Sequence, residues 1–240
     1  MDQNFTRSVL SWYDAGHRDL PWRHTKDAYR IWISEIMLQQ TRAETVVSYY
    51  ERFLARYPDV YALADAPEEE LLKAWEGLGY YSRARSLQKA AKLIVSQHGG
   101  ELPADLEKLR ALPGIGDYTS GAIASIAFGI PAAAVDGNVE RVVCRYFALS
   151  EEMGSPKSRR MIHDLTQELV PPDRPGAFAN AMMEMGATMC TPKSPACLLC
   201  PVRENCKGHA RGIAANLPVK PRKKAQRVEM RCVMLVFCQN

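Results

Sequence analysis

The stretch that decides the fold is LEKLRALPGIGDYTSGAIASIA, residues 106–127. Its pattern predicts one helix over residues 106–112 and a second, rich in small side chains, over residues 118–127. Between them a tight turn is expected, because Gly114 and Gly116 let the backbone bend sharply. The turn leaves amide N–H groups bare at the start of the second helix, where a phosphate can bind. Alone the motif is weak evidence, since any pair of helices needs a turn residue.

The rest of the chain, up to about Arg211, has the same helical character. Apolar residues recur at spacings of three and four, as in Leu87, Ala90 and Ile94, and proline or glycine breaks fall between the segments. Helical segments with short connections predict an all-α fold. One segment differs, because residues 228–237 predict a buried β-strand that no partner strand precedes.

The composition excludes several classes of protein. Of the 240 residues, 47% are hydrophobic, which excludes wholesale disorder. No apolar run approaches the length of a membrane span, and the N-terminus lacks the basic and then apolar start of a signal peptide. We therefore expect a cytoplasmic, nucleoid-associated bacterial protein in which the seven cysteines do not form disulfides.

Basic residues are concentrated near the C-terminus. Residues 203–231 carry nine basic and two acidic side chains, whereas the remainder is slightly acidic. Such a stretch is typical of a protein that binds a polyanion. Residues 217–227 also have the prolines and the low apolar content of a solvated linker, and charge alone favours the linker.

Four cysteines fall within one short loop, with the spacing C-x6-C-x2-C-x5-C: Cys190, Cys197, Cys200 and Cys206. Four thiolates this close together can hold a metal centre. Structural zinc sites usually show two short knuckles, whereas this loop has one, so its longer arms favour a 4Fe–4S cluster over zinc. Four unpaired structural cysteines are the remaining alternative, which the clustering disfavours.

Asp136 stands at the start of an apolar helical run, in the sequence VDGNV, residues 135–139. Aspartate in this position is a common helix N-cap. Capping would also keep the carboxylate ionised and fix its orientation, so one side chain can serve both the fold and a reaction.

Together these three motifs resemble the helix–hairpin–helix DNA glycosylases of the endonuclease III superfamily, over nearly all of residues 1–216. The resemblance implies that the hairpin, including Leu112, Gly114 and Gly116, grips the phosphates of one DNA strand. It implies that Asp136 stabilises the cationic sugar as the base leaves. It also implies a six-helix domain over residues 24–134, and an iron–sulfur cluster domain over residues 1–23 and 135–216.

The residue after the hairpin distinguishes two kinds of glycosylase. Bifunctional members carry a lysine two positions after the last glycine of the hairpin, where this chain has Tyr118. An imine with the sugar needs an amine, so lyase chemistry by that route is absent. We expect Tyr118 to hydrogen-bond near the sugar or Asp136, and the enzyme to be monofunctional.

A second set of motifs is similar to the MutY-type adenine DNA glycosylases: WISEIMLQQTR at 32–42, LPWR at 20–23 and WEGLGYYSR at 75–83. Glu35 matches the catalytic acid of that family. Adenine leaves poorly unless a ring nitrogen is protonated, and the apolar neighbours Ile33, Ile36 and Met37 would raise the pKa of Glu35 toward neutrality by desolvation. The alternative for Glu35 is a solvated carboxylate on a helix surface.

The same resemblance assigns further residues to the DNA and to the flipped base. The alternative for Gln40 is an ordinary surface position, and the alternative for Tyr80 is a place in the core. The assigned residues are Gln40 as a wedge in the duplex with Gln39 and Thr41 beside it, Tyr80 beside the opposite base, Arg18, Trp22 and Arg23 lining the adenine pocket, and Asn138 orienting Asp136.

The expected function is excision of adenine paired with 8-oxoguanine or guanine in double-stranded DNA, by a monomer. The alternatives are a thymine or uracil mismatch glycosylase, and a non-catalytic iron–sulfur protein that binds DNA. Residues 228–240 would begin a C-terminal β-rich domain, reached through the basic linker 217–227 and cut off at Asn240. On that interpretation the preference for 8-oxoguanine over guanine is expected to shrink.

Overall fold

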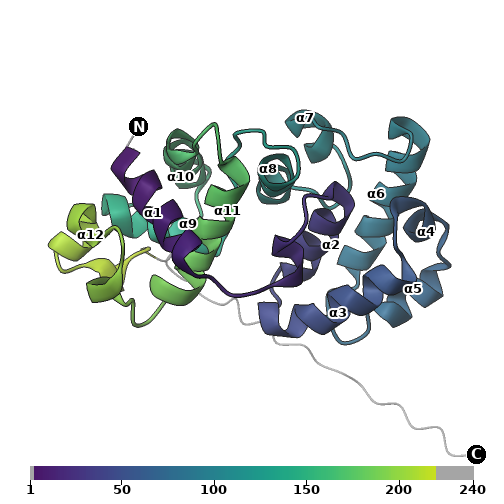
Figure 1. Cartoon of the computed structure of the whole chain (residues 1–240), viewed down its shortest axis with the longest axis horizontal. Coiled ribbons are helices and arrows are strands. Elements are labelled where there is room, and N and C mark those ends of the chain that lie inside the picture. The colour runs from purple at the N-terminus through teal and green to yellow at the C-terminus, as the bar shows by residue number, and fades with distance from the viewer. Residues whose placement is uncertain (1–2, 220–240) are drawn as a thin grey trace, which may run out of the picture.

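The computed structural model describes residues 3–219, and the regular elements within them are all helical (Figure 1). The all-α prediction is therefore confirmed for this range. Most of the predicted linker and the whole predicted strand at 228–237 lie outside the described residues. No helix in the described range has the length and apolar character needed to cross a membrane. The α-helices are α1 Gln3–Ala15, α2 Ala28–Leu38, α3 Ala43–Arg56, α4 Val60–Asp65, α5 Glu68–Ala74, α6 Ser82–His98, α7 Leu106–Arg110, α8 Asp117–Ile126, α9 Gly137–Phe147, α10 Pro156–Leu169, α11 Pro175–Glu184 and α12 Lys207–Ala210.

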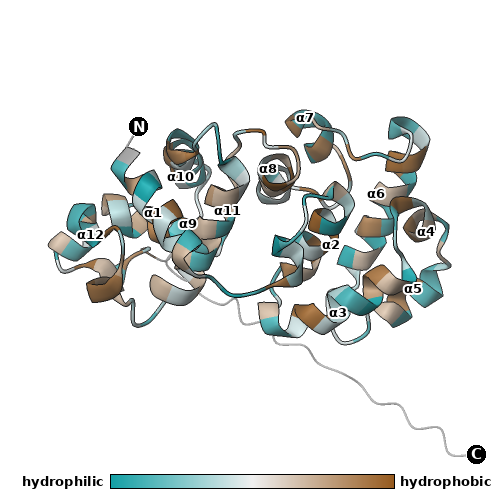
Figure 2. Cartoon of the chain, in the orientation of Figure 1, coloured by the Kyte–Doolittle hydropathy of each residue, from teal (hydrophilic) through white to brown (hydrophobic). Residues whose placement is uncertain are grey.

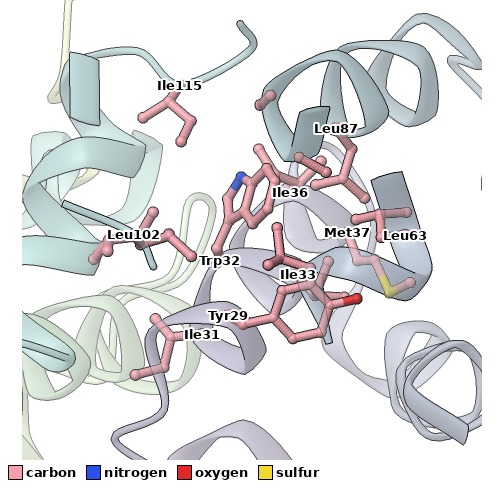
Figure 3. Close-up of a cluster of buried hydrophobic side chains, with 14 of the residues drawn as sticks. Tyr29, Ile31, Trp32, Ile33, Ile36, Met37, Leu63, Leu87, Leu102 and Ile115 are labelled. Atoms are coloured by element: carbon pink, nitrogen blue, oxygen red, sulfur yellow. The ribbon is translucent and has the colours of Figure 1, made fainter. Parts of the chain in front are cut away.

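One hydrophobic cluster is built from the helices between α2 and α8. Helix α2 is apolar on most of its surface and is therefore buried on most sides. Figure 3 shows Trp32, Ile36 and Met37 of this helix packed toward Leu63 of α4 and Leu87 of α6. Each of these side chains is at most 3% exposed, so α2 is fixed firmly in the middle of the cluster.

A second cluster joins the two ends of the described chain. Phe5 and Val9 of α1 pack with Val143 of α9 and Met182 of α11. A hydrogen bond of 2.8 Å from Thr6 Oγ1 to the carbonyl of Leu169 adds a polar tie between α1 and α10. Figure 1 shows α1 among α9, α10 and α11, on the side of the molecule opposite α3 to α6.

Helix α8 lies between the two groups of helices (Figure 2) and packs on both α2 and α11. Small residues allow the close approach. A Cβ atom on Gly176, in the first turn of α11, would lie 2.7 Å from the carbonyl oxygen of Ser125. A Cβ atom on Gly121 would lie 2.1 Å from the carbonyl oxygen of Ala133. Side chains at the start of α8 can therefore meet residues from both clusters.

The hairpin forms as predicted, with α7 and α8 beginning and ending within two residues of the expected bounds. Its two glycines have different tasks. Gly114 has a φ of +79°, and a Cβ atom there would lie 2.9 Å from Ser86 Cβ. Gly116 has an ordinary φ of −95° and caps α8 without any side-chain hydrogen bond. The expectation that both glycines bend the turn is therefore wrong for Gly116, where an added Cβ atom would meet no neighbouring atom within 4 Å.

Candidate active site

Glu35 lies in the third turn of α2, a helix that begins at an Asp27 N-cap with a 2.8 Å bond from Arg30 N. Its side chain is 3% exposed, so the surface alternative for this residue is wrong. The buried position follows from the apolar neighbours that the sequence shows on both sides of it. A carboxyl group in such surroundings favours its neutral form.

Tyr118 supplies a direct hydrogen bond to this carboxyl group. Its hydroxyl donates to Glu35 Oε2 and lies 3.1 Å from the sulfur of Met183 on α11. The pKa of Glu35 is raised to about 7, mainly by burial and also by the charge of Asp136, against the lowering effects of the bond from Tyr118 and the charge of Arg23. Burial also raises the pKa of Tyr118 well above its ordinary value, so the phenol stays neutral. The arrangement makes Glu35 a carboxylic acid able to hold its proton near neutral pH.

Asp136 caps α9, as its position predicts. Its Oδ1 accepts hydrogen bonds of 2.9 Å from Asn138 N and 2.8 Å from Val139 N. Burial raises the pKa of Asp136, against these bonds and the charge of Arg141, which lower it. The cap therefore fixes the carboxylate, but it does not hold the pKa below the ordinary value, contrary to the expectation from capping alone.

Asn138 reaches back to the same carboxylate. Its Nδ2 donates to Asp136 Oδ2 at 2.7 Å, while its Oδ1 accepts from Arg141 Nη2 at 2.8 Å. Arg141 in turn donates through Nε to the carbonyl of Cys190 at 2.7 Å. A continuous set of hydrogen bonds thus runs from Asp136 to the first residue of the cysteine loop.

Arg18 and Arg23 converge on one buried carboxylate, Glu184, which is 2% exposed at the end of α11. Arg18 Nη2 lies 2.8 Å and Arg23 Nη2 lies 2.6 Å from Glu184 Oε2. Burial opposes ionisation of Glu184, but the two guanidinium groups outweigh it and lower its pKa to about 2. The pair with Arg23 is buried, whereas the side chain of Arg18 is 36% exposed. The charge of Arg23 also lowers the pKa of Glu35.

Two predicted site residues have their side chains in the core. Trp22 is buried and meets Tyr50 edge to face, with ring centroids 5.5 Å apart. Leu112 is buried in the first cluster, and its carbonyl accepts from Ile115 N at 3.1 Å. The structure thus leaves Leu112 only its backbone for a contact with DNA, and it gives Trp22 a packing role in the first cluster.

The loops after α2 and before α6 carry the remaining predicted residues. Gln39 Nε2 lies 3.4 Å from Thr119 Oγ1 on α8, which places this loop beside the start of the hairpin helix. Gln40 is exposed with a φ of +60°, and Tyr80 is 63% exposed with a φ of +47°. Thr41 Oγ1 lies 3.5 Å from the carbonyl of Gln39. Gln40 is at the surface, as its alternative has it, whereas the core alternative for Tyr80 is wrong. Both exposed positions agree with a DNA-facing role.

The four cysteines of the loop line one small pocket. Arg145 of α9 reaches into its wall, with Nη1 at 3.4 Å from the Sγ atom of Cys190. No three His, Cys, Asp or Glu side chains in residues 3–219 are grouped so that they could hold one metal ion. In a tetrahedral zinc site with Zn–S bonds of about 2.3 Å, the sulfur atoms would lie only about 3.8 Å apart.

A comparison with protein families shows the superfamily of this chain. The model of the HhH-GPD superfamily of base excision DNA repair proteins matches residues 33–172, which include the hairpin, Glu35 and Asp136. The chain belongs to this superfamily. Among its relatives are adenine DNA glycosylases from rat, 47% identical over 90% of the chain and 44% of the relative, and from Buchnera aphidicola, 35% identical over 92% and 62%. The chain spans less than half of the rat and human proteins that it matches.

Solved structures of superfamily members have the same fold. A thermostable thymine-DNA glycosylase superposes with a TM-score of 0.78 at 31% identity, over 86% of this chain and 95% of that one. A trapped endonuclease III–DNA covalent intermediate superposes with a TM-score of 0.73 at 25% identity, over 87% and 95%.

The sequence motifs did not reveal Glu184, which the structure places beside Arg18 and Arg23 in the candidate site. A signal was present, since the run MEMG at 183–186 places an acidic side chain in an otherwise apolar helix. Such a residue is usually paired when buried. Its partners Arg18 and Arg23 stand more than 160 residues earlier, so only the fold shows the pairing.

Proposed function

We propose that the chain is a monofunctional adenine DNA glycosylase that acts on adenine paired with 8-oxoguanine or guanine. The observation that carries this proposal is the buried Glu35, whose pKa is about 7. Tyr118 donates a hydrogen bond to its carboxyl group, and the charge of Asp136 contributes to its raised pKa. The relatives named adenine DNA glycosylase, at 35–47% identity, support the choice of adenine. The joint presence of the two carboxyl groups argues against a non-catalytic DNA-binding protein.

In the proposed reaction, adenine is flipped out of the duplex into the space before Glu35. The protonated Glu35 transfers its proton to a ring nitrogen of adenine, so that the base leaves as a neutral molecule. Positive charge develops on the sugar, and ionised Asp136 stabilises it while Asn138 holds the carboxylate in orientation. A water molecule then adds to the anomeric carbon and gives a proton to the Glu35 carboxylate, which restores the acid, while Tyr118 stays neutral throughout.

Contact with DNA is proposed for the face that carries the hairpin. The uncapped amides at the start of α8 would bind a phosphate, and the open space at Gly116 would let the phosphate approach. Gln40 and Tyr80 would enter or touch the duplex beside the flipped base, since both are exposed on neighbouring loops. Arg18 and Arg23 would line the base pocket, where Glu184 fixes both guanidinium groups in position.

We propose that Cys190, Cys197, Cys200 and Cys206 hold a 4Fe–4S cluster. The donor set fits, because the four thiols line one pocket and cysteine thiolates are the usual ligands of such a cluster. Arg145 can donate to a thiolate of Cys190 there. When bound, the cluster would supply structural order to the loop that carries Lys193, Arg203 and Lys207.

We also propose the domain division described above, with the catalytic residues where the two parts meet. The two hydrophobic clusters support it, since one draws on residues from Leu20 to Ala132 and the other on α1 and residues after Val139. Trp22 belongs to the first cluster, so the boundary near residue 23 would lie slightly earlier. We propose a monomer acting at the bacterial nucleoid in the cytoplasm.

The experiment that tests the proposed activity is a single-turnover excision assay. Matched duplexes would carry A opposite 8-oxoguanine, A opposite G, T opposite G, or U opposite G. Release of adenine only from the first two is the expected result. Release of thymine or uracil in place of adenine would support the mismatch glycosylase instead, and release of no base would support the non-catalytic alternative.

The pH profile of excision is a further prediction. Because protonated Glu35 is the proposed acid and its pKa is about 7, the single-turnover rate is expected to fall as pH rises through that value. The fall approaches about tenfold per pH unit above it. The measurement is the rate at saturating enzyme, with duplex affinity measured at each pH as the control. A rate that is unchanged between about pH 6 and about pH 9 would contradict the role of Glu35.

Monofunctionality predicts the outcome of borohydride treatment. A phenol at position 118 cannot form an imine, so reduction during turnover is expected to give no substantial covalent adduct. Gel electrophoresis of enzyme mixed with substrate duplex measures the adduct, with a lysine-bearing bifunctional glycosylase as the positive control. A strong adduct would show that another lysine acts as a nucleophile.

A further inference from the structure

Two exposed residues near the candidate active site have an unusual backbone. Among the described residues, the non-glycine positions with positive φ are Gln40, Tyr80 and Ala148. Side chains disfavour this region of φ, at a cost of order 1–3 kcal/mol for a residue held there. Gln40 and Tyr80 lie on different loops, yet both project from the surface. Something in the surrounding structure must hold each of them in place.

The guanidinium of Arg83, in the first turn of α6, contacts both loops. Through Nη1 it donates to the carbonyls of Ile36 at 2.9 Å, Met37 at 3.0 Å and Gln39 at 2.6 Å. These carbonyls lie at the C-terminal end of α2, where helical partners run out and the helix dipole favours a positive charge. One nitrogen thus fixes the backbone directly before Gln40.

The other terminal nitrogen of Arg83 serves the second loop. Nη2 donates to the carbonyls of Leu78 at 2.8 Å and Gly79 at 3.3 Å, directly before Tyr80. It also lies 3.4 Å from Thr41 Oγ1, which follows Gln40. The guanidinium carbon lies 5.7 Å from the centre of the Tyr80 ring. Within residues 3–219 Arg83 forms no salt bridge, and its other face lies over the buried Trp75 ring at 5.5 Å, so its hydrogen bonds go to these two loops.

We propose that Arg83 is a positioning residue that holds Gln40 and Tyr80 together as one preorganised element for DNA. This inference rests on the proposed function, in which those two side chains meet the duplex. The planar fork of arginine is what allows one side chain to serve two loops, because its nitrogens point in fixed, different directions. A lysine has a single nitrogen and cannot reproduce both sets of bonds. With both loops set in advance, DNA binding need not order them.

The test uses a duplex with a stable tetrahydrofuran abasic site and 2-aminopurine opposite it. Binding of the unsubstituted protein is expected to unstack the 2-aminopurine and raise its fluorescence. Arg83→Lys is expected to lose more than half of that rise and to weaken binding by about tenfold. Arg85→Lys is the matched control, because Arg85 lies on the same helix and its ion pair within the described range is with exposed Glu68 at 2.8 Å. A normal fluorescence rise with Arg83→Lys would overturn the proposal.

A double-mutant comparison separates positioning from simple destabilisation. If Arg83 acts through the two exposed side chains, Arg83→Lys should change affinity by less than about twofold in a Gln40→Ala/Tyr80→Ala background. A tenfold loss that persists in that background would overturn the proposal. If Arg83→Lys fails to fold, Thr41→Val replaces it in the test, because it removes one acceptor of the Arg83 guanidinium. Thr41→Val is expected to weaken DNA binding by about twofold to threefold when Gln40 and Tyr80 are present, and to have no effect in the Gln40→Ala/Tyr80→Ala background.

The readout does not depend on excision. If the protein releases no adenine but the fluorescence and affinity results are as expected, the proposed function fails and the role of Arg83 stands. If adenine is released but Arg83→Lys behaves like the unsubstituted protein, the role of Arg83 fails alone.

Discussion

Replacing Glu35 by Gln is expected to reduce the single-turnover rate of adenine release by at least about 1,000-fold. The amide has the size of the carboxyl group and can keep the contact with Tyr118, but it has no proton to give to the leaving base. DNA affinity is expected to change little, because Glu35 is buried and does not face the phosphates. Near-normal excision by Glu35→Gln would refute the assigned role of this residue.

The same substitution is expected to stabilise the protein above neutral pH. The pKa of Glu35 is raised from 4.5 in the unfolded chain to about 7 in the folded protein. The neutral carboxyl group therefore contributes to the free energy of unfolding in full below about pH 4.5, and this contribution is lost as pH rises through about 7. At pH 8 the loss amounts to about 3 kcal/mol, which an amide avoids. Denaturant unfolding at about pH 8 and about pH 5 measures the difference, which should be large at the first and small at the second.

Glu184 gives a matched control for this stability effect. It is as buried as Glu35, but its pKa is lowered to about 2 by Arg18 and Arg23. Its contribution is therefore present above about pH 4.5 and lost only as pH falls through about 2. Glu184→Gln should destabilise the protein at pH 8, the opposite of Glu35→Gln. If both substitutions stabilised the protein at pH 8, or both destabilised it, the charges around these two carboxyl groups would be wrongly assigned.

The second large effect is expected at the cysteine loop. Replacing Cys200 by Ala should abolish iron binding and much of the folded protein, because metal binding and folding are coupled in such loops. The unsubstituted protein, purified without oxygen, should be brown and contain iron and sulfide in equal amounts. Iron and sulfide analysis with circular dichroism measures both effects.

Cys144→Ala is the control for this loss. Cys144 is a free, buried cysteine of α9 that does not line the loop pocket, so its substitution should leave the iron content unchanged. Stoichiometric zinc without iron in the unsubstituted protein would exclude the proposed cluster. A folded, active Cys200→Ala protein would exclude a structural role for it.

The parts of the fold that the sequence predicted well are local. The hairpin helices fall within two residues of their expected bounds, because the turn and the helical periodicity lie within one short stretch. The burial of Glu35 and the capping by Asp136 follow in the same way from immediate neighbours. Each of these features depends on residues a few positions away, which a sequence displays directly.

The parts that the sequence did not predict depend on distant residues or on competing energies. The pairing of Glu184 with Arg18 joins opposite ends of the described chain. The bonds of Arg83 go mostly to backbone carbonyls, which carry no sequence signal. For Asp136 the sequence shows the cap but not the burial that raises its pKa against that cap. Pattern alone gives no measure of which of two opposed effects is larger.

The double duty of Asp136 has a consequence for reading genetic variation in proteins of this kind. Asparagine is as good a helix N-cap as aspartate, and burial already disfavours the charged form. Its amide nitrogen would face the Asn138 Nδ2 donor at a cost of about 1 kcal/mol, so Asp136→Asn should still be folded. It should nevertheless be inactive, because the charge opposite the sugar is gone. A survey that ranks variants by cellular abundance would class this substitution as benign. For such a position, the quantity of protein present says nothing about how much damaged DNA it repairs.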